Sequence, residues 1–156
     1  MRGKKRLANI FAKDLHAKIA EELADLYVME NFSQPILIPI PLSKKRYRER
    51  GYNQAELICR ELVEADNKQN TKGSFRLEEK VLIKPYETAH QARIHNRRER
   101  MENVIGSFAV KNAELIAGQN IILIDDITTT GATLSEARKV LKKYGARKII
   151  AFTIAH

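Results

Sequence analysis

The N-terminal part of the chain alternates apolar and charged positions with a helical period. Between residues 7 and 27 the apolar residues recur at steps of three and four, with charged residues between them. This spacing predicts an amphipathic helix whose apolar stripe lies on the core. After a break at residues 33–35, the run Ile36-Leu37-Ile38 is typical of a buried strand, and the prolines that follow are expected to end its pairing.

A second helix is predicted to begin at Asn53. Asn53 and Glu56 have the spacing of a capping box, and Ala55, Ile58, Cys59 and Leu62 mark one apolar face. Cys59 is therefore interpreted as a core residue. The polar stretch 66–74 contains Gly73 and is expected to be a connecting loop before a short strand at residues 81–83.

Residues 86–103 are polar and basic and show neither a helical nor a strand period. A segment of this length without a period is a candidate mobile loop. It is followed by a predicted strand at residues 107–110.

The C-terminal part carries the clearest pattern. A turn at residues 117–120 precedes an apolar strand at 121–124, and a second apolar strand follows at 149–154. The helix predicted between them ends at Gly145 and turns inward Leu134, Ala137, Val140, Leu141 and Tyr144. Strands that are apolar throughout and alternate with helices predict an α/β fold with a parallel sheet covered on both faces. Ligands of such sheets bind at the carboxyl ends of the strands.

Length and composition favour one domain over residues 1–156, with an N-terminal helical part at 1–34 and a core at 36–156. The apolar runs are far shorter than the roughly 20 residues needed to span a bilayer, and the chain does not open on a signal pattern. The single cysteine, Cys59, and four scattered histidines fit neither a disulfide framework nor a zinc module. We therefore expect a cytoplasmic protein without zinc or a membrane span.

The formal net charge of +9 is concentrated in three basic clusters, at residues 2–6, 44–50 and 93–100. Phosphates of a small substrate, a nucleic acid backbone or a simple requirement for solubility would each account for this charge. Charge alone does not decide among them.

Two adjacent acids, Asp125 and Asp126, stand at the end of the apolar strand and are followed by Ile127 and a hydroxyl-rich turn that opens the next helix. A helix N-terminus, threonine hydroxyls and the flexible backbone of Gly131 together suit an anion, and the carboxylates suit ribose hydroxyls or the hydration shell of Mg²⁺. The Gly-Lys-Ser/Thr ending of a nucleotide P-loop is absent. The structural alternative is that Thr133 and Glu136 form a capping box and the acids only end a strand.

The segment from Ile121 to Thr133 resembles the phosphoribosyl pyrophosphate signature of the type I phosphoribosyltransferases, with four apolar residues, two acids and a Thr-Thr-Gly-x-Thr loop. Other residues are similar to the ComF and GntX branch of that superfamily: Pro39, Ile40, Pro41, Leu42, Ser43, Arg46, Arg50, Gly51, Tyr52, Asn53, Gln54, Thr88, Gln91, Arg100, Asn103 and Phe108. The resemblance implies the type I phosphoribosyltransferase fold, a mainly parallel Rossmann-like sheet flanked by helices, with a long flexible loop and a minimal hood.

The resemblance also implies roles for individual residues. It implies a Mg²⁺-dependent transferase of the glycosyltransferase class with Asp125 and Asp126 on the ribose hydroxyls, close to the metal, and Arg100 in a loop that closes over the reaction. The 5-phosphate would be held by Thr128, Thr129, Thr130, Gly131, Ala132 and Thr133. The pyrophosphate would be held by the turn of Leu42, Ser43, Lys44, Lys45 and Arg46, where binding a diphosphate is expected to need a strained or cis peptide.

The chain departs from this family in three places. The four-cysteine zinc ribbon of many ComF-like proteins is absent, Thr129 stands where purine-salvage enzymes carry an acid, and the spacing from Gln91 to Arg100 is one residue longer. The acceptor substrate is not indicated. As an alternative, the resemblance implies a competence protein that has no transferase activity and binds single-stranded DNA or DNA-uptake proteins. An exposed apolar strip on the first helix would favour a homodimer.

Overall fold

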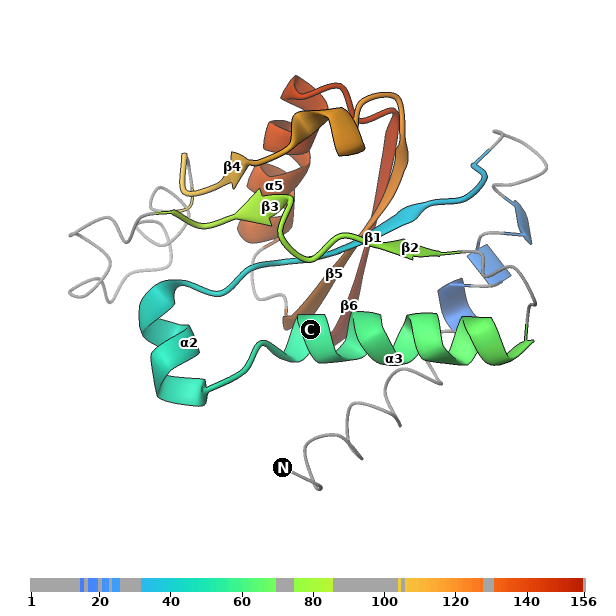
Figure 1. Ribbon diagram of the computed structural model, residues 1–156, viewed down its shortest axis with the longest axis horizontal. Coiled ribbons are helices and arrows are strands. Elements are labelled where there is room, and N and C mark those ends of the chain that lie inside the picture. Colours follow the sequence, from blue (N-terminus) through green and yellow to red (C-terminus); the bar gives the residue numbers. More distant parts are fainter. Residues whose placement is uncertain are drawn as a thin grey trace.

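The computed structural model describes residues 15, 17–19, 21–22, 24–25, 32–69, 75–85, 104, 106–127 and 131–155. Its main sheet has the strand order β2-β1-β5-β6, with β1 at Ile36–Pro39, β2 at Arg76–Leu77, β5 at Asn120–Ile127 and β6 at Lys148–Ala155. All three pairings are parallel. The predicted parallel α/β architecture is therefore confirmed, with β2 as an edge strand that the sequence pattern did not indicate (Figure 1).

Pairing of β1 continues one residue further than predicted. Pro39 lies opposite Ile124 of β5, and the next N–H, that of Ile40, donates to the Ile124 carbonyl at 2.8 Å. The missing N–H of Pro39 is tolerated because alternate residues of an interior strand bond to opposite neighbours. An N–H at position 39 would point toward β2. Because β2 pairs only with Ile36 and Leu37, no bond to β2 is lost at Pro39.

A second, separate ribbon pairs β3 at Leu82–Ile83 with β4 at Ala109–Val110 in antiparallel register. The sequence predicted both strands but not their pairing. The 86–103 segment, which joins them, lies entirely outside the described residues, so its predicted mobility stays a prediction. A short 3₁₀ helix, η2 at Ala113–Leu115, follows β4.

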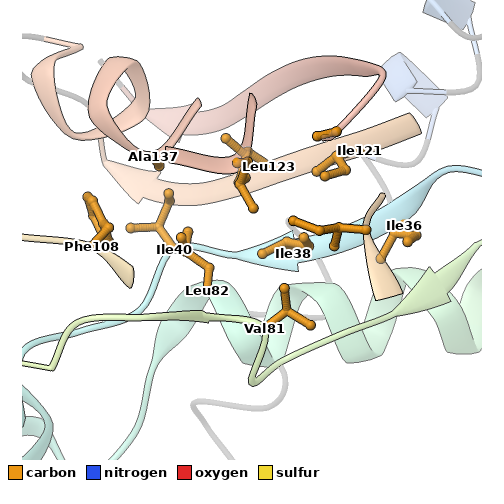
Figure 2. Close-up of a cluster of buried hydrophobic side chains, with 12 residues drawn as sticks. Ile36, Ile38, Ile40, Val81, Leu82, Phe108, Ile121, Leu123 and Ala137 are labelled. Atoms are coloured by element: carbon orange, nitrogen blue, oxygen red, sulfur yellow. The ribbon is translucent and has the colours of Figure 1, made fainter. Parts of the chain in front are cut away.

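The main sheet has a hydrophobic core on each face, because successive side chains of a strand point to opposite sides. Ile122 and Ile124 of β5 face the core formed with α3 (Gln54–Gln69), which includes Leu15 and Ile19 of the first predicted helix. Ile121 and Leu123 face the other core, with α5 (Ala132–Lys143), Leu82 of β3 and Phe108, the residue before β4 (Figure 2). The two faces carry different parts of the candidate site.

Two predictions about helices need correction, and one helix was not predicted. The loop predicted at 66–74 begins later, because α3 continues to Gln69; the buried Asp66 carboxylate accepts the Phe75 N–H at 3.2 Å and fastens the end of that helix to the next strand. Tyr144 does not point inward but is 41% exposed after the last turn of α5. A short helix that was not predicted, α2 (Lys44–Arg50), follows β1. In the part of the chain that is described, no helix has the length and apolar character of a membrane span.

Candidate functional site

The ends of β1 and β5 lie side by side at the carboxyl edge of the main sheet, and a buried amide holds the chain there. Asn53 is 3% exposed and donates from Nδ2 to the Ile40 carbonyl at 2.9 Å. Its Oδ1 accepts the Ala55 N–H at 3.1 Å, so it also caps α3 as predicted. The Ile40 N–H in turn donates to Ile124, the residue before the two acids. One side chain thus closes the segment between β1 and α3 into a loop at the acids.

That loop contains the predicted pyrophosphate-binding residues, and part of it is helical. Ser43 is the N-cap of α2, with its hydroxyl accepting the Arg46 N–H at 3.3 Å. Gly51 ends the helix in the left-handed region, with φ of 73°. The turn predicted at 42–46 is therefore wrong from Lys44 onward, where α2 begins, and no described peptide bond is cis. None of the α2 residues is buried, so their cationic side chains reach solvent.

The two acids of β5 lie on opposite faces of the strand. Asp125 is 7% exposed and accepts the N–H of Asp126 at 2.9 Å. The Asp126 side chain is 21% exposed, and its Oδ2 pairs with Nη1 of Arg50 at 3.2 Å, which brings the last residue of α2 to the end of β5. Because neighbouring side chains of a strand alternate, a single ligand can meet both carboxylates only by lying across the strand end.

Lys84 is a site residue that the sequence analysis missed. It follows β3, and its Nζ lies 5.4 Å from the centroid of the Phe108 ring. Burial lowers the pKa of Lys84 and the nearby Arg46 guanidinium lowers it further, while the Asp125 carboxylate opposes both. Lys84 is thus within electrostatic reach of the predicted pyrophosphate segment and of one of the two acids. A lone lysine directly after a short apolar strand was the only signal in the sequence.

The predicted 5-phosphate loop is described in part. Thr128, Thr129 and Thr130 lie outside the described residues, while Gly131, Ala132 and Thr133 form the start of α5. Gly131 has φ of 71°, and a Cβ placed there would meet nothing within 4 Å. Glycine is required here by its left-handed backbone, which turns the chain from β5 into α5.

The capping box considered as a structural alternative does not form. Gly131, which has no side chain to form a cap, is the N-cap of α5 in place of Thr133. The Glu136 carboxylate, 8% exposed, instead accepts the Gly106 N–H at 2.9 Å. It thereby ties α5 to the segment that leads into β4. This buried acid is a second residue whose role the sequence analysis did not find.

One of the remaining predicted site residues lies at the start of α3, and the other four lie outside the described part of the chain. Gln54 is the first residue of α3, next to Asn53. Thr88, Gln91, Arg100 and Asn103 lie outside the described residues, so their predicted place in a closing loop is untested. Among the described residues, no group of three or more His, Cys, Asp or Glu side chains could hold a metal ion.

A comparison with known families identifies this architecture. The phosphoribosyl transferase domain family matches residues 49–156, which include α3, β5, α5 and β6. This chain belongs to that family. The resemblance noted in the sequence, to the ComF-like branch of the type I phosphoribosyltransferase fold, is confirmed by similarity to competence proteins.

Individual relatives agree with this placement. The chain is 32% identical to competence protein ComFC of Bacillus subtilis (strain 168) over 156 residues, covering 98% of this chain and 55% of that protein. It is 26% identical to the DNA utilization protein YhgH of Escherichia coli O6:H1 over 113 residues, covering 72% and 45%. The chain thus spans about half the length of these relatives.

A solved structure shows the same fold. A hypoxanthine phosphoribosyl transferase of Trypanosoma cruzi superimposes with a TM-score of 0.54 at 12% identity, over 96% of this chain and 64% of that one. At this identity the similarity concerns the fold alone.

Proposed function

We propose that this protein binds 5-phosphoribosyl 1-pyrophosphate together with Mg²⁺ and transfers the phosphoribosyl group to an acceptor. The observation that carries the proposal is the grouping of charges at the carboxyl edge of the sheet. Two carboxylates lie across the end of β5, and each has a basic side chain near it: Arg50 pairs with Asp126, and Lys84 lies within reach of Asp125. A ligand with hydroxyls in the middle and phosphates at its ends matches this arrangement.

Each part of the ligand has a counterpart in the chain. The 5-phosphate would lie on residues 128–133, where the amides of the first turn of α5 and its dipole favour an anion. The ribose hydroxyls would lie across the strand end and donate to Asp125 and Asp126. The pyrophosphate would face Arg46 and Lys84, two cations from separate elements, of which Arg46 lowers the pKa of Lys84.

The residues present fit Mg²⁺ held mainly by the substrate. Mg²⁺ prefers six oxygen ligands and keeps several waters, so it needs only one or two protein carboxylates. Asp125 and Asp126 are the candidates, because the described residues offer no larger cluster of acids. When bound, the ion would neutralise negative charge on the pyrophosphate as it leaves.

In the reaction, the bond from the anomeric carbon to the pyrophosphate oxygen breaks and a bond to the acceptor forms. The pyrophosphate leaves with the electron pair, and the acceptor loses a proton. Arg46 and Lys84 would stabilise the departing charge, because cations placed before the reaction act where charge develops. Arg100 would add to this from the predicted closing loop, which would also exclude water from the sugar.

Thermal unfolding with and without phosphoribosyl pyrophosphate and Mg²⁺ tests this proposal. At 100 times the dissociation constant, a ligand that binds only the folded protein adds about 2.7 kcal/mol. For a chain of this size the midpoint should rise by about 5 to 10 °C.

The informative variant is Asp125→Asn with Asp126→Asn, because Asn keeps the oxygen that accepts the Asp126 N–H while both charges are lost. The matched control is Glu114→Gln, which removes an exposed acid on η2. We expect the shift to vanish in the double variant and to persist in the control. An equal shift in the parent and the double variant would contradict the assignment of the site.

We propose DNA handling as a second function, because two separate sets of relatives carry names that point to it. These relatives are called competence proteins and DNA utilization proteins. The basic side chains of α2, all exposed, are one candidate surface for nucleic acid. Sequence-independent binding of this kind should weaken steeply as salt is raised.

A further inference from the structure

A strongly basic surface lies away from the candidate site, on the second half of α5 and the turn that follows it. We call it the amino-edge patch and define it by five exposed cationic residues and one exposed aromatic residue: Arg138, Lys139, Lys142, Lys143, Arg147 and Tyr144. It was not among the three basic clusters noted in the sequence, because its cations alternate with core residues such as Val140 and Leu141.

The fold places this patch at the end of the molecule opposite to the acids. The helix α5 starts beside the carboxyl end of β5 and has 12 residues, so it spans about 18 Å. Its far end is fastened to the turn that precedes β5, through Gly118 N–H to Gly145 O and Arg147 N–H to Gln119 O, both at 2.8 Å. In Figure 1 α5 lies in the upper part of the view, whereas α2 lies at the lower left. A ligand in the candidate site would therefore not cover the patch.

Few acids oppose these cations among the described residues nearby. Glu136 lies 3.8 Å from the Lys139 ammonium, but this acid is 8% exposed and is already bonded to the Gly106 N–H. The Lys142 ammonium donates to the Arg147 carbonyl, which fixes the turn without neutralising either charge. The patch therefore keeps a net positive charge.

The exposed aromatic ring distinguishes the patch from an ordinary solvated helix face. Among the residues described, Tyr47 and Tyr144 are the exposed large hydrophobic side chains, and Tyr144 stands within the patch. Surfaces that bind single-stranded nucleic acid combine two elements, cations that contact the phosphates and an aromatic ring on which a base stacks. Both are present in the patch. A membrane surface fits less well, because an interfacial helix needs a wide apolar face and here that face is buried in the core.

We propose that the amino-edge patch binds the backbone and a stacked base of single-stranded nucleic acid, at a site separate from the phosphoribosyl site. This inference rests on the second proposed function and assigns it to α5 rather than to α2. Binding there would be independent of sequence, because no part of the patch reads base edges.

The test is fluorescence anisotropy of a labelled single-stranded oligothymidylate, titrated with the full chain at several salt concentrations. One variant combines Arg138→Gln with Lys143→Gln, and a second carries Tyr144→Ser. A matched variant combines Lys44→Gln with Arg48→Gln and removes the same charge from α2. Each single-strand phosphate contact contributes about 0.7 to the slope of log K against log salt. The α5 pair should therefore lower the slope by about 1.4, and loss of stacking in Tyr144→Ser should weaken binding about tenfold.

The outcomes separate this inference from the functions on which it rests. If the α2 pair flattens the slope and the α5 pair does not, DNA binding stands and the patch assignment is wrong. If the parent binds no oligothymidylate, or binds vesicles of phosphatidylcholine and phosphatidylserine instead, both the patch and the second function fail. The thermal shift with phosphoribosyl pyrophosphate and Mg²⁺ should be unchanged in the α5 variants; its loss there would contradict the separation of the two sites.

Discussion

Asn53 is expected to hold the segment between β1 and α3 in place. The free energy of unfolding that is lost when Asn53 is substituted measures how much this contact contributes. In Asn53→Ala the N-cap of α3 is lost, which costs about 0.5 to 2 kcal/mol. The buried Ile40 carbonyl also loses the Asn53 amide as a donor, and a buried group without its partner costs about 1 to 3 kcal/mol. Together these effects predict a loss of about 1.5 to 5 kcal/mol in the free energy of unfolding and a midpoint lower by about 3 to 20 °C.

Asn53→Asp separates the two contributions. Aspartate caps helices as well as asparagine does, so it keeps the acceptor for the Ala55 N–H. It cannot donate to the Ile40 carbonyl, and it brings a negative charge close to Glu56. We therefore expect Asn53→Asp to be at least as unstable as Asn53→Ala, although capping alone predicts almost no change.

The assay is urea unfolding followed by circular dichroism, with Asn67→Ala, an exposed substitution within α3, as the control. That control should stay within about 0.5 kcal/mol of the parent. Parent-like stability of Asn53→Asp would show that the bond to Ile40 contributes nothing and would refute this part of the account.

Two further predictions concern groups whose protonation the fold disfavours or favours. Lys84→Met should raise the thermal midpoint, because it removes a partly buried charge whose pKa is lowered by burial and by Arg46. The same change should weaken phosphoribosyl pyrophosphate binding by about 10- to 100-fold through loss of a charged hydrogen bond, and a calorimetric titration in which affinity is unchanged would contradict the role of Lys84. Burial raises the pKa of Glu56 from its ordinary value of 4.5, so the stability linked to its protonated form is fully present below that pH and is lost as the pH rises through the raised pKa. Glu56→Gln should therefore be more stable than the parent at neutral pH and equal to it in acid, and urea unfolding at both pH values that showed the same difference would exclude this linkage.

The central parallel strands could be predicted because both of their faces are covered. The apolar runs in β1, β5 and β6 pack against helices on each side, and such runs are visible in a sequence without any partner. The strand β2 is only Arg76 and Leu77, too short to show a period, and its pairing depends on where α3 ends. Tyr144 matched the helical period but lies just beyond the last helical turn, where the period no longer decides which way a side chain points.

The candidate site was predicted less completely, because its geometry depends on pairs that are distant in the sequence. The helix α2 has no apolar face. Caps at Ser43 and Gly51 and the ion pair between Arg50 and Asp126 help to hold it in place. The opposite facing of the two acids follows from strand alternation, but only once β5 is known to run through both. Lys84 was missed because its neighbours come from other elements.

A crystal structure of the protein grown with phosphoribosyl pyrophosphate and Mg²⁺ would show directly whether this ligand binds at the carboxyl edge of the main sheet. We expect the 5-phosphate on residues 128–133, the ribose hydroxyls across the end of β5 against Asp125 and Asp126, and the pyrophosphate facing Arg46 and Lys84. A ligand bound elsewhere on the chain, or crystals grown at saturating ligand with no density at the end of β5, would contradict this assignment.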